Sequence, residues 1–194
     1  MRYLLTLGSN LGDKLENLEF AIARLPEVLE QSSIFISSPV DMEPIAQDFA
    51  NMAVCVRYDD LPHKLLRLIH EIEDAAGRLR PYRNAPRTLD IDIIYAQDIV
   101  VESLDLKIPH PRASERLFVL APIAEIDQTI ASKLAGFEFS LEDCLAGNYA
   151  SQFIGQSLRR YIELGPRDDL GRIIASQGVL ERIENDSRTH DVSD

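Results

Sequence analysis

Two amphipathic helix patterns, each lying between strand-like segments, constrain the fold of this chain more than any other feature. Strand-like apolar runs cover residues 2–8, 32–38, 49–58 and a segment that begins at residue 90. Apolar residues at helical spacing separate them, namely Leu15, Leu18, Ile22 and Leu25 in one segment and Leu61, Leu65, Leu68, Ile69 and Ile72 in the other. This order predicts an α+β, ferredoxin-like β-α-β-β-α-β sandwich, with both helices on one face of an antiparallel-rich sheet.

Local signals mark the ends of these helices. Asp13 followed by Glu16 is typical of a helix start, and Gly77 is typical of a helix end. Residues 8–12, which read G-S-N-L-G, lack the lysine of a P-loop, so we interpret them as a tight strand-to-helix turn.

The last third of the chain carries further helical patterns. Apolar residues recur at helical spacing at Phe153, Ile154, Leu158, Tyr161 and Ile162, and again at Leu170, Ile173, Ile174, Leu180 and Ile183. We therefore expect a helical C-terminal extension over residues 127–184, followed by a disordered tail over residues 185–194. The apolar faces of this extension could cover the chain's own surface or form a homodimer, so monomer and homodimer both stay open.

Composition excludes several classes of partner. Of 194 residues, 45% are apolar, which is ample for a core. A net charge of -12 argues against nucleic acid and anionic membranes as partners, because both require a broad basic face. No apolar run approaches the roughly 20 residues of a membrane span, and we expect a cytoplasmic protein. The two cysteines, Cys55 and Cys144, have no metal or redox spacing and are expected to be buried.

Residues 77–92 concentrate charge in a way that predicts a site. They read G-R-L-R-P-Y-R-N-A-P-R-T-L-D-I-D, and the arginines are Arg78, Arg80, Arg83 and Arg87. On a strand, Asp90 and Asp92 point to one face, about 6.6 Å apart along the backbone. Such a pair can hold Mg²⁺, which commonly bridges carboxylates to phosphates, and arginine grips phosphate oxygens.

These arginines could instead neutralise acidic side chains on a solvated surface. Pro81 and Pro86 favour a functional interpretation, because they make the segment a loop rather than a salt-bridged helix. The segment therefore predicts chemistry on a polyphosphate.

Two other places offer candidate contacts. Asn51 shares a strand face with Phe49, and the pair suits a flat, nitrogen-rich ring, although a satisfied core asparagine is the better interpretation of Asn51 in isolation. His110 lies between two prolines, which suits a phosphate donor or a proton shuttle, or only a turn. Arg116 and Phe118 follow shortly after.

Together these segments resemble the 6-hydroxymethyl-7,8-dihydropterin pyrophosphokinase family of folate biosynthesis. The resemblance runs from about residue 3 to residue 125. It rests on L-G-S-N-L-G at 7–12, S-x-F-x-S-x-P at 33–39, Q-D-F-A-N at 47–51, Glu73, G-R-x-R at 77–80, P-R-T-x-D-x-D at 86–92, P-H-P at 109–111, Arg116 and Phe118.

The resemblance implies a role for each matching residue. Asp90 and Asp92 would hold two Mg²⁺ and, with Arg78 and Arg87, act in catalysis on ATP. The remaining nucleotide contacts would be Glu73, Arg80, Arg83, His110 and Arg116. Phe49 and Phe118 would sandwich the pterin, and Asn51 would read its edge.

The implied activity is ATP-dependent transfer of pyrophosphate to the pterin by a catalytic domain over residues 1–126, with only small molecules as partners. A nucleotidyltransferase shares Gly8-Ser9 and a carboxylate pair, but the pair lies some eighty residues too late. A non-catalytic pterin- or nucleotide-binding homologue stays open. It is favoured by Asn84-Ala85 and Asp41, where the family commonly has Trp-Gly and Gly.

Overall fold

An antiparallel sheet forms the centre of the molecule. The structure is a computed structural model and describes residues 1–39, 47–79 and 85–161. Its main strands are β1 (Arg2–Ser9), β2 (Val28–Gln31), β3 (Phe35–Ser37), β4 (Phe49–Arg57), β5 (Asp90–Ala96) and β8 (Leu158–Arg160). They pair antiparallel in the order β5-β1-β4-β3-β8, and β2 also pairs with β4. A separate hairpin joins β6 (Val101–Glu102) to β7 (Lys107–Ile108).

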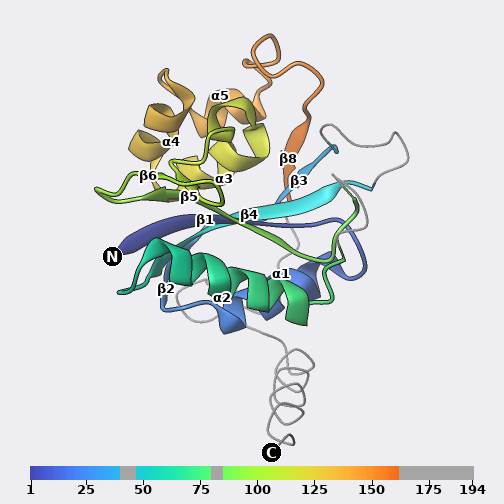
Figure 1. Cartoon of the computed structure of the whole chain (residues 1–194). Helices are drawn as coiled ribbons and strands as arrows, with labels where there is room; N and C mark the ends of the chain where they lie inside the picture. Colours follow the sequence, from blue (N-terminus) through green and yellow to red (C-terminus); the bar gives the residue numbers. More distant parts are fainter. Residues whose placement is uncertain (40–46, 80–84, 162–194) are drawn as a thin grey trace, which may run out of the picture.

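Helices cover both faces of this sheet (Figure 1). Helices α1 (Lys14–Arg24) and α2 (Pro62–Ala75) lie on one face. The short 3₁₀ turn η1 (Ala113–Glu115) leads into α3 (Leu117–Ile126), which covers the other face with α4 (Gln128–Ala135) and α5 (Leu141–Leu145). The β-α-β-β-α-β succession expected from the sequence is therefore present, with both of its helices on one face.

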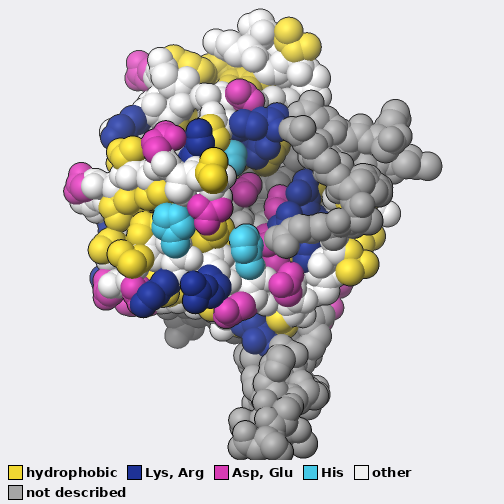
Figure 2. Space-filling model, viewed as in Figure 1, with side chains coloured by type: hydrophobic (Ala, Val, Ile, Leu, Met, Phe, Trp, Pro, Cys, Tyr) yellow, Lys and Arg dark blue, Asp and Glu magenta, His cyan; other side chains and the backbone are white. Residues whose placement is uncertain are grey.

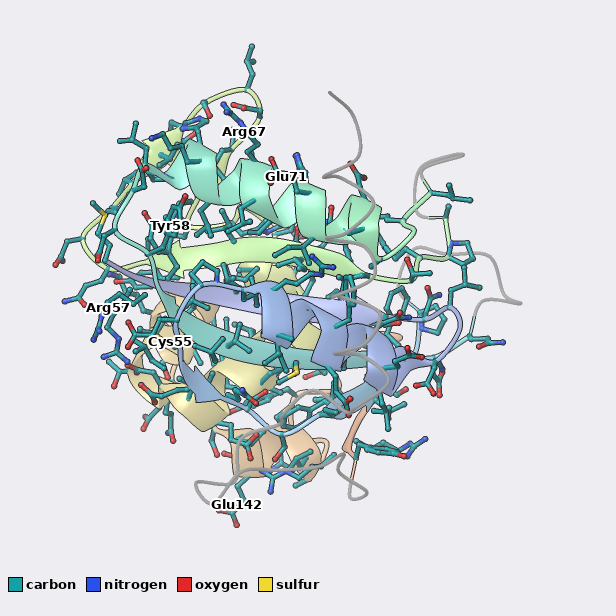
Figure 3. All side chains as sticks on the ribbon, turned by 90° about the horizontal axis from the view of Figure 1, so that it is seen from below. Cys55, Arg57, Tyr58, Arg67, Glu71 and Glu142 are labelled. Carbon is teal, nitrogen blue, oxygen red and sulfur yellow. The ribbon has the colours of Figure 1, made fainter. Side chains whose placement is uncertain are left out.

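The two predicted helices begin and end where their local signals indicate. The Asp13 side chain accepts a hydrogen bond from the Glu16 backbone N–H (3.0 Å), which caps α1. Helix α2 ends at Ala75, and Gly77 has a φ of 75°, which glycine adopts without strain. Figure 3, which views the molecule from below, shows α1 and α2 on the near side of the sheet, with Arg67 and Glu71 on α2. Both side chains are exposed.

Alternation along the strands creates two cores. Leu5 and Leu7 pack towards α1 and α2, whereas Leu4 and Cys55 pack towards α3. Phe139, which lies beyond α4, belongs to the same core as Leu4. The described part of the 127–184 segment therefore shares its core with the sheet. Cys55 and Cys144 are both buried free thiols, as predicted.

The strand register brings distant residues into one row across the sheet. Asp90 of β5 is opposite Gly8 of β1, and Gly8 is opposite Asn51 of β4. Asn51 is in turn opposite Phe35 of β3. Two residues along β5, Asp92 is opposite Thr6 of β1. The carboxylate pair on β5 and Asn51 on β4 thus lie on either side of β1, at one end of the sheet.

Two sequence-based expectations need correction. The strand expected over residues 32–38 is shorter, and a further strand, β2, precedes it. The helix predicted through Leu158 and Tyr161 is wrong, because residues 158–160 form strand β8. The physical reason is that β3 would otherwise leave an unpaired edge, and pairing its backbone groups outweighs a helical apolar pattern.

The helix expected around residues 170–183 and the tail at 185–194 lie outside the described residues. Within the described ranges, the structure contains no helix long and apolar enough to cross a membrane.

Candidate active site

A cavity of about 250 Å³ opens where β5, β1 and β4 reach the same end of the sheet. Its lining consists of Thr6, Leu7, Gly8, Ser37, Ser38, Phe49, Asn51, Arg78, Arg87, Asp90, Asp92, His110, Arg112, Arg116 and Phe118. Figure 2 shows basic, acidic and histidine side chains gathered around a hollow on this face. The tertiary structure therefore brings together most of the side chains singled out in the sequence.

Arginines surround the carboxylate pair. Arg78 Nη1 lies 2.5 Å from one carboxylate oxygen of Asp90, and Arg87 Nη1 lies 3.1 Å from the other. Arg116 Nη1 lies 3.8 Å from Asp92 Oδ2. Among the described residues, Nε of Arg78 and Nε of Arg87 are buried and have no hydrogen-bond partner. Buried donors of this kind are costly unless a ligand satisfies them.

Glu73 lies behind Arg78. Its side chain is 1% exposed, it pairs with Arg78, and its Oε1 accepts the Ile91 backbone N–H at 2.8 Å. Glu73 does not line this cavity, but it lines the adjoining cavity described below. This position suits a residue that orients Arg78, and the direct nucleotide contact expected for Glu73 stays a prediction.

The local environment changes the protonation of Asp92. Burial, followed by the negative charge of Asp90, raises the pKa of Asp92 to about 6, against the opposing charges of Arg116, Arg87 and Arg78. The side chain still exposes 35% of its surface. Asp92 is therefore packed among protein atoms on one side and open to a cation on the other.

His110 is a neutral hydrogen-bonding group at neutral pH. Burial, followed by the charges of Arg116 and Arg112, lowers the pKa of His110 to about 4. Its Nδ1 lies 3.2 Å from the Arg112 backbone N–H and accepts that hydrogen. The proton of the neutral ring is then on Nε2, which can donate to an anion. This favours the phosphate donor over the proton shuttle.

The opposite part of the cavity suits a flat ring. Asn51 is 4% exposed, and its Nδ2 donates to Ser37 Oγ at 3.0 Å. A side chain on Gly8 would place a Cβ 3.2 Å from Asn51 Oδ1, so the glycine allows the amide to lie against the cavity floor. Arg87 lies over the Phe49 ring at 5.6 Å, and Arg116 over the Phe118 ring at 5.5 Å.

Sequence reasoning missed several residues that line this cavity or hold its lining in place. Asn10 was assigned only to a turn, yet its Oδ1 accepts the Arg87 backbone N–H at 2.8 Å and its own N–H donates to Arg87 O at 3.2 Å. Ser38 and Arg112 line the cavity without a signal of their own. Arg80 and Arg83 were predicted to contact the nucleotide and lie outside the described residues.

A second cavity of about 380 Å³ adjoins the first and shares Arg78, Asp90, Asp92 and His110 with it. The rest of its lining is more apolar and comes from α2, β5 and the β6–β7 hairpin, including Leu66, His70, Ile93, Leu104, Leu106 and Lys107. These residues are dispersed in the sequence, so no local motif identified them. The carboxylate pair lies between two distinct compartments.

Known structures and sequences resemble this chain. The fold is similar to that of the HPPK-DHPS protein of Plasmodium falciparum, with a TM-score of 0.57 and 14% identity over 84% of this chain and 47% of the other. The chain thus spans about half of that protein. A pyrophosphokinase from Bacillus subtilis is 42% identical over 143 residues, which are 71% of this chain and 85% of the relative. One from Aquifex aeolicus is 34% identical over 129 residues, 65% of this chain and 80% of the relative.

The relatives define the class of the chain as a kinase-type transferase, a pyrophosphokinase of folate synthesis. Residues 4–128 match the model of 7,8-dihydro-6-hydroxymethylpterin-pyrophosphokinase, and the chain belongs to that family.

Proposed function

We propose that the chain transfers a pyrophosphoryl group from MgATP to the hydroxymethyl oxygen of 6-hydroxymethyl-7,8-dihydropterin. The oxygen attacks the β-phosphorus, the bond from that phosphorus to the oxygen of the α-phosphate breaks, and AMP leaves. The observation that carries this proposal is the single cavity that holds Asp90 and Asp92 beside Asn51 and Phe49. Family membership supports it independently.

The carboxylate pair fits two Mg²⁺ ions. Asp90 and Asp92 offer hard oxygen ligands from one strand face, and substrate phosphates and water complete such a site. Within the described ranges, no group of three or more metal-binding side chains occurs, which agrees with a metal that is held partly by its substrate. When bound, Mg²⁺ would neutralise phosphate charge and polarise the entering and leaving oxygens.

The arginines then supply most of the positioning. In the structure Arg78 and Arg87 pair with Asp90. With metal on Asp90, both guanidinium groups would turn to the phosphates, where their unpaired Nε–H groups find acceptors. Arg116 and the Nε2–H of His110 would donate to the same anion. Phosphoryl transfer depends mainly on such positioning and charge neutralisation.

The two compartments would hold the two substrates. Phe49 and Phe118 would stack on the pterin, and Asn51, held in place by Ser37, would hydrogen-bond its edge. The adjoining compartment, with its apolar Leu66, Ile93 and Leu106, would take the adenosine. Its larger volume and the shared carboxylates suit a nucleotide whose phosphates point to Asp90 and Asp92.

The remaining assignments follow this proposal. We describe the β1-α1-β3-β4-α2-β5 unit as ferredoxin-like because its strand order β5-β1-β4-β3 and its two helices on one face fit that arrangement. A catalytic domain over residues 1–126 agrees with the family match over residues 4–128. A cytoplasmic location, the extension to residue 184 and the choice between monomer and homodimer stay predictions.

The decisive experiment measures AMP formed from MgATP with and without the dihydropterin, with the Asp92→Ala variant as control. We expect AMP that depends on the pterin and on Mg²⁺, and that is lost in the variant. Tight binding of pterin or ATP without AMP would instead favour the non-catalytic homologue, for which only Asn84-Ala85 and Asp41 argue.

A further inference from the structure

Residues 153–161 return to the active-site cavity from a part of the chain beyond the family match, which ends at residue 128. The segment is anchored by Phe153, which is 3% exposed and belongs to the core beneath α3. The Gln156 N–H donates to Phe153 O at 3.1 Å. Gln156 and Ser157 are therefore held at a defined place next to the cavity wall.

Gln156 binds the backbone on both sides of Arg116. Its Nε2 donates to Glu115 O at 2.7 Å, and its Oε1 accepts the Leu117 N–H at 3.0 Å. One side-chain amide thus joins the two peptide groups that flank Arg116. Arg116 carries the guanidinium group that lies 3.8 Å from Asp92.

These bonds replace a missing helix cap. Arg116 is the N-cap residue of α3, and its side chain makes no capping hydrogen bond. A Ser, Thr, Asp or Asn at this position would fold back to satisfy the first turn. An arginine that must reach into the cavity cannot do so. Gln156 supplies the acceptor for the first N–H of α3, that of Leu117, from 39 residues away.

Ser157 contacts the opposite wall. The Ser38 N–H donates to Ser157 O at 3.2 Å, and the Ser157 N–H donates to Ser38 Oγ at 3.1 Å. Ser38 lines the cavity, and strand β8 continues the pairing along β3. Two consecutive residues therefore tie the start of α3 to the end of β3, across the compartment assigned to the pterin.

We propose that Gln156 is a positioning residue that sets Arg116 and Phe118 for the reaction by fixing the backbone on both sides of Arg116. The inference rests on the proposed function, because it takes Arg116 and Phe118 as substrate contacts. Gln156 itself does not line the cavity. Its effect passes through the orientation of the first turn of α3.

The first test compares Gln156→Ala with Gln152→Ala. Gln152 is an exposed glutamine immediately before this segment. We expect Gln156→Ala to lower kcat/KM for the dihydropterin by about 10- to 100-fold, because a displacement of about 1 Å at a reacting site can cost on the order of 10²-fold. Gln152→Ala should match the wild type. Equal activity of all three proteins would overturn the inference.

A double-mutant cycle separates positioning from a general loss of structure. If Gln156 acts through Arg116, then Gln156→Ala should cost less in an Arg116→Ala background than in the wild type, since the losses of coupled residues are not additive. The cost that remains in that background measures the share that passes through Phe118. The full 10- to 100-fold loss in that background would show that Gln156 does not act through Arg116. Should Gln156→Ala fold poorly, Gln156→Glu keeps the acceptor for Leu117 and replaces it in the cycle.

Amide hydrogen exchange distinguishes a failure of this inference from a failure of the proposed function. If the wild type forms no pterin-dependent AMP, the proposed function fails, and exchange in the ligand-free protein then decides the role of Gln156. We expect the Leu117 amide to exchange at least about ten-fold faster in Gln156→Ala than in Gln152→Ala, because its hydrogen bond is lost. Equal protection in both variants would overturn the inference.

Discussion

Oppositely charged side chains balance one another around Asp90. Arg78 and Arg87 each pair with one of its carboxylate oxygens, and Glu73 pairs with Arg78 from the buried side. The arginines are thus held near the position that the phosphates would take, but their Nε–H groups have no acceptor among the described residues. Binding can exchange one set of ion pairs for another with little movement of the backbone.

Replacing Arg87 should test whether this cation acts mainly in the transition state. We expect Arg87→Ala to lower kcat by about 10³-fold or more and to weaken ATP binding by less than about ten-fold, because charge develops on the transferring group during reaction. Steady-state kinetics and direct ATP titration measure the two effects. Arg67→Ala, on exposed α2, is the matched control. Equal losses in kcat and affinity would indicate a uniform binding role instead.

Asp92 should destabilise the metal-free protein when it is ionised. Its pKa of about 6 in the folded protein lies above the value of about 4 expected in the unfolded chain. The folded state therefore binds more protons in this window, and the free energy of unfolding falls as pH rises from about 4 to about 6. Well above pH 6 Asp92 is ionised, and its full destabilisation of the folded state is present.

We accordingly expect Asp92→Asn to be more stable than the wild type at pH 8 in the presence of a chelator. The free energy of unfolding should rise by about 1 kcal/mol, after allowance for the exposed part of the side chain. This corresponds to roughly 2–4 °C in the thermal midpoint. At pH 4.5 this difference should shrink, because wild-type Asp92 is then mostly protonated. Thermal unfolding at both pH values checks the sign. Asp74→Asn, an exposed change on α2, serves as control. A variant that is less stable at pH 8 would contradict the argument.

At the level of elements, the spacing between β1 and β4 shapes the ring compartment. Gly8 and Asn51 are opposite each other in this pair, and the amide oxygen lies 3.2 Å from the position that a β-carbon on residue 8 would take. Phe49 is also close, at 3.7 Å from that position. The absence of a side chain at residue 8 of β1 therefore leaves room for the Asn51 amide of β4.

Gly8→Ala should impair the pterin compartment selectively. The added carbon would meet Asn51 Oδ1 at 3.2 Å and force the amide to shift by a few tenths of an ångström. We expect KM for the dihydropterin to rise about ten-fold, because each lost hydrogen bond is worth about 1 kcal/mol or more, while KM for ATP changes little. Stability should stay within about 1 kcal/mol. An equal rise in both KM values would indicate a wider disturbance of the sheet.

Strand β8 shows how a long-range partner outweighs a local pattern. Leu158 and Tyr161 are three apart, as in an apolar helix face, yet residues 158–160 pair with β3. Arg160 of β8 also pairs with Glu125 of α3 at 2.8 Å. A single-sequence pattern contains no information about which edge in the fold is unpaired.

For the whole molecule, the charge distribution separates the site from the rest of the surface. The chain has a net charge of -12, but Arg78, Arg87, Arg112 and Arg116 converge on one cavity. The acidic surroundings disfavour polyanions such as nucleic acids, whereas a small anion can be held by the cluster. The final ten residues, 185–194, are polar and charged apart from Val192 and contribute no apolar face.

We expect deletion of residues 185–194 to leave kcat and both KM values within about two-fold of the full chain, because polar terminal segments seldom carry packing contacts. The same AMP assay on the truncated and full-length proteins measures this. A loss of ten-fold or more would show that the tail takes part in the active site.

The sequence by itself determined the features that depend on neighbours along the chain. Short-range backbone geometry determines the helical spacing of the apolar residues in α1 and α2. It also determines the Asp13 cap and the shared face of Asp90 and Asp92. Only the tertiary structure decided that Glu73 lies behind Arg78, that Asn10 holds Arg87, and that Gln156 caps α3. The physical reason is that strand register, edge pairing and the satisfaction of buried polar groups depend on contacts between segments tens of residues apart, which a local pattern does not specify.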